Sequence, residues 1–445
     1  AAKIRRARMG LTFQDWERLP PGRWTILPPG VGSGPTLARA SPGVTLSLLG
    51  GSKGLLGGGG FLRLQRRDTL RGVRGVEQGQ IRKIVVSDFH LGSGRLVGEL
   101  NPWENFFYDQ EFADLLLYYS SGDFADQEIE LIINGDFFDL LQVRYDGGFP
   151  VHVTEQIAAS KLKAALDGHP VVMHALARFV NQPRKSITVL PGNHDFELMF
   201  PACHHMFCER VTGSMTDPRM RFVLDKPYYE FDGVQIHHGM QFEAINSYRF
   251  DEKFLVEGWP EPILRQPFGS IFVLEVLNTM KAYRPYIDRV QPLSLYLFGA
   301  LFLDPFVAWR LILLSIRTFY RWRIKPLFRR PAVEGADLRS TMEVLKAYSA
   351  FPNFERKVKR IMRKNPRIHT LIMGHTHLRK VRRFGHGKTY INTGTWTDLI
   401  SLEISQLGVN RELTYATVEY FPDEPPQARL LAWKGFTHVS RDIHY

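Results

Sequence analysis

The chain has 445 residues, of which 44% are hydrophobic and 23% are charged, a balance typical of a soluble globular protein with a substantial core. Its formal net charge of +12 favours anionic partners such as nucleic acid, acidic lipid or a phosphorylated substrate. The only cysteines, Cys203 and Cys208, exclude a disulfide framework, so we expect a reducing compartment.

Residues 1–78 differ in composition from the rest of the chain. They contain four consecutive glycines at 57–60, two Pro-Pro pairs and scattered arginines, with little apolar surface to pack. No uninterrupted apolar stretch follows Arg5 and Arg6, so we expect no cleavable signal peptide. We expect residues 1–78 to be disordered, or to be an extension from a reading frame that starts upstream of Met9.

Five short apolar runs, each followed at once by polar side chains, are the main pattern after residue 80. The runs with their polar ends cover 84–90, 131–136, 187–195, 234–239 and 370–377. Helical segments are expected between them, around 103–120 and 155–181, so the pattern predicts βα units and a layered α/β fold. Ligands bind at the carboxyl ends of strands in such sheets, so the five polar clusters are expected to form one site.

Strand-like runs return after residue 388. They cover 389–392, 413–421 and 428–433. We expect these runs to complete a second sheet.

The polar ends of the runs supply a consistent set of metal ligands. The candidates are two carboxylates, four imidazoles and one carboxamide: Asp88, His90, Asp136, Asn193, His238, His375 and His377. Oxygen and nitrogen ligands without a thiolate suit Mn, Fe, Zn or Mg. Asp88 with His90, and His375 with His377, can each grip one ion. Asp136, which follows Gly135, is the candidate bridge between two ions about 4 Å apart.

Five separately spaced motifs carry a resemblance to a known family. They are Asp88-x-His90, Gly135-Asp136-x-x-Asp139, Gly192-Asn193-His194-Asp195, His238-Gly239 and Gly374-His375-Thr376-His377. In this order they resemble the signature motifs of the calcineurin-like metallophosphoesterases. The resemblance implies a four-layer αββα sandwich with a long, mainly helical insertion. We therefore expect a catalytic core at 79–240 and 366–445 and an insert at 241–365.

The resemblance also implies a role for each site residue. Asp88, His90, Asp136 and His377 would hold one metal ion, and Asp136, Asn193, His238 and His375 the other. His194 would act on the phosphate as a general acid or as a stabiliser of charge, with Asp195 and Asp139 supporting it. The implied reaction is hydrolysis of a phosphoester or pyrophosphate by a hydroxide that bridges two divalent ions, for which Mn is our first choice.

Several polar residues have a structural alternative. His237 is expected to be packed rather than a ligand. His204 and His205, with the two cysteines, have the types needed for a second, structural metal, but no motif surrounds them. Asp139 has two possible roles: it caps a helix, or it orients a metal ligand.

A strongly apolar stretch at 292–316, interrupted by Asp304 and Arg310, lies inside the expected insert. Basic and aromatic residues alternate directly after it, from Arg317 to Arg330, and a second basic cluster occupies 356–367. Three interpretations stay open: a transmembrane span, a helix on an anionic membrane surface, and a cap packed on the core. The basic and aromatic neighbours favour the membrane surface.

The motif strings and the apolar insert also resemble the UDP-2,3-diacylglucosamine pyrophosphatases, a peripheral-membrane branch of the same superfamily. The insert is longer here, and His194 replaces the arginine usual in that branch. This resemblance implies a lipid-linked nucleotide substrate and a cytoplasmic protein on the inner face of the membrane. Two alternatives remain: a nuclease, and a membrane scaffold with a degenerate site. Large apolar side chains lie among the basic ones, which argues against nucleic acid as the partner.

Overall fold

The computed structural model describes residues 80–95, 100–328, 341–342, 354–402, 407–422, 424–436 and 440–442. All of them belong to the unit at residues 74–445. The disorder expected for residues 1–78 therefore falls outside the described residues.

A seven-stranded sheet holds the first three of the apolar runs. Its strand order is β17-β16-β15-β1-β2-β3-β4. The strands are β1 (Gln80–Val86), β2 (Ile129–Asn134), β3 (Lys185–Leu190), β4 (Met220–Phe222), β15 (Thr414–Tyr420), β16 (Gln427–Trp433) and β17 (Ser440–Asp442). Strands β1 to β4 are parallel, whereas β15 pairs antiparallel with β1. The carboxyl ends of β1, β2 and β3 therefore lie at one edge.

A five-stranded sheet holds the other two runs. Its strand order is β11-β12-β10-β6-β5. The strands are β5 (Tyr229–Phe231), β6 (Val234–His237), β10 (Thr370–Met373), β11 (Lys380–Arg383) and β12 (Thr389–Asn392). Strand β10 is parallel to both β6 and β12, so the ends that carry His238 and His375 also lie together.

Alternation along the strands explains why the two sheets pack face to face. In β1, Ile84 and Val86 point to the helical side and Val85 points to the other sheet. In β10, Ile372 meets Val85 in the same inner cluster. Because both faces of each central strand are apolar, each sheet must be covered on both sides.

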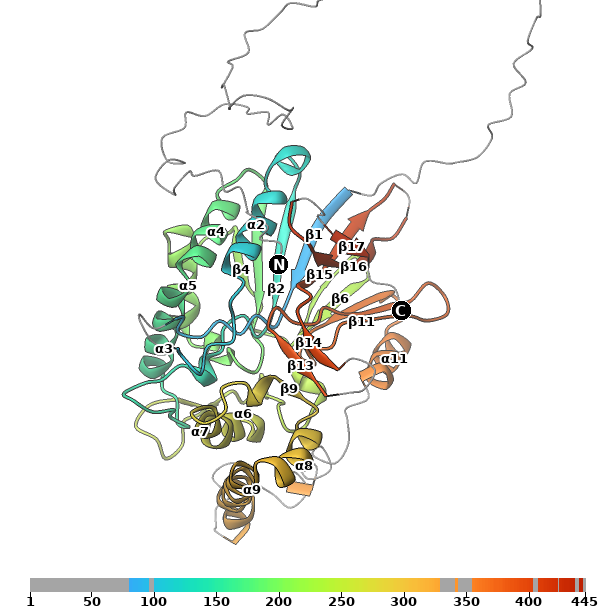
Figure 1. Cartoon of the computed structure of the whole chain (residues 1–445). Coiled ribbons are helices and arrows are strands. Elements are labelled where there is room, and N and C mark those ends of the chain that lie inside the picture. Colours follow the sequence, from blue (N-terminus) through green and yellow to red (C-terminus); the bar gives the residue numbers. More distant parts are fainter. Residues whose placement is uncertain are drawn as a thin grey trace, which may run out of the picture. The chain divides into compact units, whose positions relative to one another are not determined.

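Helices cover the two outer faces. The first sheet packs against α2 (Asp109–Tyr118), α3 (Glu155–Gly168), α4 (Pro170–Val180) and α5 (Pro201–Thr212). The second packs against α11 (Phe354–Lys364), through Phe354, Val358 and Met362. Figure 1 shows the resulting order of helices, sheet, sheet and helix. The expected four-layer αββα arrangement is present.

The described residues between β6 and β10 are mainly helical. They form α6 (Phe268–Phe272), α7 (Asn278–Lys281), α8 (Leu293–Leu303) and α9 (Pro305–Phe319), with π-helical turns at Val273–Leu277 and Tyr320–Ile324. Short strands accompany them: β7 (Phe254–Leu255) pairs with β8 (Ile263–Leu264), and β9 (Val290–Gln291) joins β13 (Leu399–Ser401) and β14 (Gly408–Asn410). The proposed division of the chain at residues 241 and 365 stays a prediction.

Two sequence expectations need correction. The runs at 413–421 and 428–433 do not complete the second sheet, since β15 and β16 extend the first one beside β1. A buried strand has the same alternation in either sheet, so the pattern could not assign it. The single helical segment expected at 155–181 is two helices, because the chain breaks at His169 and α4 restarts with Pro170 at its first position.

The apolar stretch at 292–316 forms two short helices. Asp304 separates them and its side chain accepts a hydrogen bond from the backbone nitrogen of Val307, so it caps α9. With 11 residues in α8 and 15 in α9, no helix in the described part of the chain is long and apolar enough to cross a bilayer.

Candidate metal centre

Tight loops at the strand ends carry most of the predicted ligands. Asp88, His90, Asp136, His375 and His377 all have φ between 51° and 70°, a left-handed conformation that is uncommon for residues other than glycine. Hydrogen bonds between the loops hold this backbone in place. The nitrogen of Asp88 donates to the carbonyl of Gly135 at 3.1 Å, and that of His90 to the carbonyl of Asp136 at 2.9 Å.

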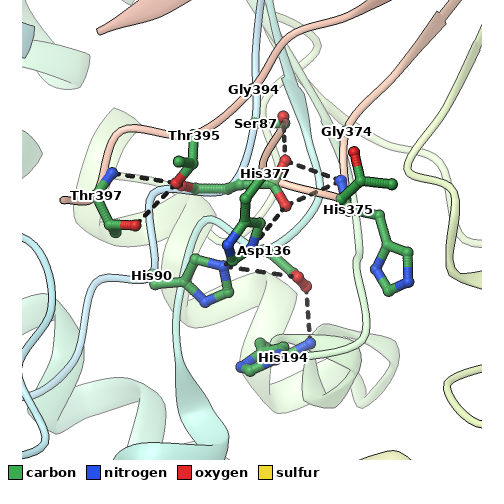
Figure 2. Close-up of polar contacts among 12 residues, drawn as sticks. Ser87, His90, Asp136, His194, Gly374, His375, His377, Gly394, Thr395 and Thr397 are labelled. Atoms are coloured by element: carbon green, nitrogen blue, oxygen red, sulfur yellow. Dashed lines mark hydrogen bonds and ion pairs between the residues drawn. The ribbon is translucent and has the colours of Figure 1, made fainter. Parts of the chain in front are cut away.

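The first group of ligand atoms comes from Asp88, His90, Asp136 and His377. Nε2 of His90 lies 2.9 Å from Nε2 of His377 and 3.9 Å from Oδ2 of Asp136. Nε2 of His377 lies 3.4 Å from Oδ1 of Asp88. Figure 2 shows the side chains of His90, His377 and Asp136 turned toward one another. These four side chains can hold one cation.

A second group forms on the other side of Asp136. It contains Asp136, His238 and His375. Nε2 of His238 lies 3.2 Å from Oδ2 of Asp136 and 3.2 Å from Oδ1 of Asn193. The structure thus brings six of the seven predicted ligands into two neighbouring groups that share Asp136, and it places Asn193 beside His238 of the second group.

His194 lies at the rim of these groups and contacts Asp139. Its Nδ1 is 2.8 Å from Oδ1 of Asp139, and its backbone nitrogen donates to Oδ1 of Asp136 at 2.8 Å. The same Asp139 lies 3.4 Å from Nδ1 of His90 and makes no side-chain helix cap. Of its two expected roles, the contacts therefore support the one that orients ligands.

The electric field of the site changes the pKa values of these groups. Burial would raise the pKa of Asp136, but His238 and His194 hold it well below its ordinary value. Burial would lower the pKa of His194, but Asp139 and Asp136 raise it to about 10. Carboxylates that stay ionised in a buried pocket are suited to bind cations, and cations bound there would oppose the charge on His194.

Asp195 supports the backbone beneath the site. It is fully buried, and its carboxylate accepts hydrogen bonds from the backbone nitrogens of Gly192 at 2.6 Å and Phe137 at 2.8 Å. Burial and the neighbouring Asp136 raise its pKa to about 7. These contacts join the loop after β3 to the loop after β2, so Asp195 positions the ligands on both.

Glu243 is a residue that the sequence motifs did not reveal. Its Oε2 lies 2.7 Å from Nε2 of His375. Burial would raise the pKa of Glu243, but His375 lowers it. No motif surrounds this residue; its position five residues after His238 was the only available signal.

The remaining candidates lie outside the ligand groups. His237 is packed between Gln235 and Gln241, in agreement with the expectation that it is not a ligand. The two glutamine side chains lie 2.8 Å and 2.6 Å from its ring nitrogens Nε2 and Nδ1. Nδ1 of His204 contacts the carbonyl of Leu198, and both cysteines are buried free thiols. Among the described residues, these side chains are not part of a group with metal-binding geometry.

The donors present fit two divalent cations. Buried carboxylate, imidazole and carboxamide atoms face one another within contact distance, which is the ligand chemistry of Mn, Fe, Zn or Mg. Nδ1 of His375 is buried with no hydrogen-bond partner, while Nε2 of the same ring is used by Glu243. A buried orphan nitrogen is costly unless a ligand occupies it, so Nδ1 is the atom of His375 that would bind a cation.

Comparison with known proteins gives only distant structural similarity. No protein-family model and no curated protein matches the chain. A predicted phosphoesterase from Streptococcus pneumoniae is 12% identical and covers 82% of this chain and 97% of its own, with a TM-score of 0.26. A dimetal phosphatase from Danio rerio is 12% identical; the match covers 82% of this chain and 99% of the phosphatase, with a TM-score of 0.33. A zinc complex of Vps29 from Entamoeba histolytica is 18% identical; the match covers 20% of this chain and 46% of Vps29, with a TM-score of 0.15. These TM-scores are too low to assign a function, which must come from the chain's own site.

Proposed function

We propose that the chain hydrolyses a phosphoester or pyrophosphate with the help of two divalent cations. The observation that carries the proposal is the position of Asp136. Its carboxylate belongs to the group with Asp88, His90 and His377 and also to the group with His238 and His375. One carboxylate shared by two ligand groups is the arrangement that places two cations close enough to act on a single phosphoryl group.

Bound cations would supply Lewis acidity, by neutralising phosphoryl oxygens and lowering the pKa of a coordinated water. The chain's residues supply the rest. The ligand side chains would hold the cations, and through them the phosphoryl group, in one orientation, and hydrogen bonds between the loops keep the left-handed backbone of these residues in place.

His194 is suited to hold and deliver a proton. Nδ1 contacts Asp139, which leaves Nε2 as the ring atom available to a substrate oxygen. The side chain is 17% exposed, whereas Asp139 is 1% exposed, so the histidine rather than the carboxylate meets the substrate side. Asp139 would fix the tautomer and orientation of the ring, and Nε2–H would stabilise or protonate the leaving oxygen.

Hydrolysis of bis(p-nitrophenyl) phosphate by metal-stripped protein tests the proposal. We expect Mn to restore turnover to the wild type and not to Asp136→Asn, while thermal unfolding shows that the variant is folded. Metal analysis should find two ions per chain in the wild type. Asp167→Asn, at an exposed surface ion pair, is the matched control and should behave as the wild type.

Turnover that does not depend on metal, or that survives in Asp136→Asn, would contradict the proposed reaction. Bound metal without turnover on phosphomonoesters, phosphodiesters or pyrophosphates would support the scaffold alternative instead. Turnover of DNA or RNA in preference to small esters would support the nuclease alternative.

The finer proposals concern metal and substrate. Mn is supported by the mixture of oxygen and nitrogen ligands without thiolate. A lipid-linked nucleotide pyrophosphate is supported by α7, which packs in one cluster with the apolar helices α8 and α9 and is hydrogen-bonded near Asp139. Asn278 donates to the carbonyl of Leu141 at 2.8 Å and Lys281 to Oε1 of Gln142 at 2.6 Å, two and three residues after Asp139.

A pair of substrates tests the lipid requirement. UDP-2,3-diacylglucosamine and UDP-glucose share the pyrophosphate, but only the first carries acyl chains. Faster hydrolysis of the acylated compound, followed by phosphorus NMR, is the expected result. Equal rates would remove the lipid requirement and leave the metal-dependent reaction in place.

A further inference from the structure

Helix α9 has apolar residues on two opposite faces. Val307, Leu311 and Leu314 point inward and pack with Val276 and Met280 of the neighbouring π-helix and α7. A second row follows helical spacing on the opposite side, with exposed fractions of 57–65%: Phe306, Trp309, Leu313, Ile316 and Tyr320. A surface helix normally carries polar residues on that side, so the outer row is not explained by folding.

Helix α8 also exposes apolar side chains. It is apolar all round, and its residues Leu293, Tyr296 and Leu297 pack in the inner cluster shared with α9. Its other side leaves Phe298 62% and Phe302 73% exposed, with their rings in edge-to-face contact. Because both helices bury their inner sides in one cluster, the outer side of each helix faces away from that cluster. Figure 1 shows the two helices at the end of the molecule farthest from β17.

The exposed area is larger than a monomeric surface usually tolerates. About ten large side chains each leave on the order of 100 Å² uncovered, against the few hundred Å² typical of the largest apolar patch on a soluble monomer. A ligand or surface of apolar chemistry is therefore expected to cover it.

Positive charge borders the apolar row. Arg317 and Lys325 are exposed, and Arg317 directly follows Ile316. Arg321 lies between them in sequence and pairs with Glu275 at 3.2 Å. Arg317 has no ion-pair partner among the residues that the structure describes. Residues 293–328 contain five basic residues and a single acidic one, Asp304, which is paired with Arg284.

The surface is held as a preformed unit. Glu275 on the π-helix accepts hydrogen bonds from Oγ1 of Thr318 at 2.9 Å and Nε1 of Trp322 at 2.9 Å. These bonds fix the end of α9 with its apolar and basic rows side by side.

We propose that the outer face of α8 and α9 binds the surface of an anionic bilayer, with the apolar row in the headgroup and acyl boundary and Arg317 and Lys325 on the lipid phosphates. A helix of 15 residues is about 22 Å long, too short to cross the hydrocarbon core but suited to lie in the interface. Aromatic, aliphatic and basic side chains together match the interfacial composition of bilayers. This inference does not depend on the proposed reaction.

Co-sedimentation of the full chain with vesicles tests the proposal. One set of vesicles contains phosphatidylcholine alone, and the other contains equal parts phosphatidylcholine and phosphatidylglycerol. We expect binding to the anionic set that weakens as salt is raised. Phe306→Ser with Leu313→Ser should reduce partitioning at least about tenfold. Arg317→Gln should reduce it roughly fivefold.

Control substitutions outside α8 and α9 show whether a loss of vesicle binding is specific to these helices. Met215→Ser with Leu407→Ser removes exposed apolar side chains elsewhere, and Arg178→Gln removes another exposed arginine in the last turn of a helix. Both, and the Asp136→Asn protein, should bind as the wild type does. Thermal unfolding confirms that each variant is folded.

Either of two results would overturn the proposal: no binding to anionic vesicles by the wild type, or equal binding by wild type and the α9 variants. Light scattering then shows whether this face instead joins two copies of the chain. A dimer that Phe306→Ser with Leu313→Ser dissociates would assign the face to a second copy of the chain.

Discussion

Glu243 holds Nε2 of His375 at 2.7 Å, so the only imidazole nitrogen left for a cation on His375 is the buried Nδ1. A carboxylate behind a ligating histidine fixes the ring and raises its basicity, and loss of such a partner commonly costs 10–100-fold in metal affinity. We therefore predict that Glu243→Gln weakens binding of the second cation by about 10–100-fold. Metal titration followed by turnover of bis(p-nitrophenyl) phosphate measures the effect. Glu252→Gln, at an exposed ion pair with Arg249, is the control; an unchanged titration for Glu243→Gln would show that the contact is incidental.

The contact between Asp139 and His194 leads to a second prediction. Asp139→Asn and His194→Gln should each reduce kcat by about a hundredfold or more, because each removes the oriented proton donor. The double variant should be little worse than either single variant, since the two act as one unit. Steady-state kinetics at saturating metal measures this. Asp146→Asn, at an exposed loop residue, controls for the chemical change. Fully multiplicative losses would mean that the residues act separately.

Gly135 allows His238 to approach the ligand group. Its φ is +77°, and a Cβ there would overlap the ring of His238 and Cα of Gly192. Gly147 has φ of +75° but no close neighbour other than the far end of Arg144, so Gly147→Ala should cost only about 1 kcal/mol of backbone strain. We predict that Gly135→Ala costs at least about 2 kcal/mol more, because packing must also shift, and impairs metal binding. Urea unfolding compares the two; equal costs would refute the clash.

His169 joins the helical layer to the loop that carries His90. Its Nδ1 lies 2.8 Å from Oδ1 of Asp109 and its Nε2 3.3 Å from Oε2 of Glu104, which also accepts from the backbone nitrogens of Gly92 and Gly94. Burial would lower the pKa of His169, but these carboxylates raise it to about 9.

Because the folded pKa exceeds the unfolded value of about 6.5, the stabilisation is complete below about pH 6.5 and is lost as the pH rises through about 9. His169→Gln should therefore cost about 1–3 kcal/mol at about pH 6 and less at about pH 9.5. Urea unfolding at the two pH values checks this. His174→Gln, at an exposed histidine of α4, is the matched control. A pH-independent cost at His169 would mean that the imidazole is neutral in the fold.

The side chains of the candidate metal centre could be predicted from sequence because each follows an apolar run within a few residues. A strand end and its loop are local features, so Asp88, Asp136 and His375 could be identified without knowing the fold. Glu243 could not, since its contact with His375 joins residues 132 positions apart and no pattern marks it. For the same reason the sheet assignment of β15 was wrong: its pairing with β1 is a long-range choice between two apolar surfaces.

The helix break at His169 had a local signal in the sequence, Pro170, which the prediction of a single helix did not take into account. Pro170 lacks a backbone N–H and starts helices readily, which explains why α4 begins there. The exposed row on α9 lay in the sequence as an apolar stretch, but only the packing of Val307 and Leu311 shows which side is left uncovered.

Strands β6 and β10 are parallel neighbours, yet α6 to α9 lie between them in the chain. A crossover between two parallel strands needs only one helix, and α11 already packs on that sheet as such a helix. The lobe of α6 to α9 is therefore not needed to connect the two strands, although α7 is hydrogen-bonded to Leu141 and Gln142 beside the loop after β2. The ligand loops and the exposed apolar helices thus lie on segments of the chain that the connection between β6 and β10 does not force to change together.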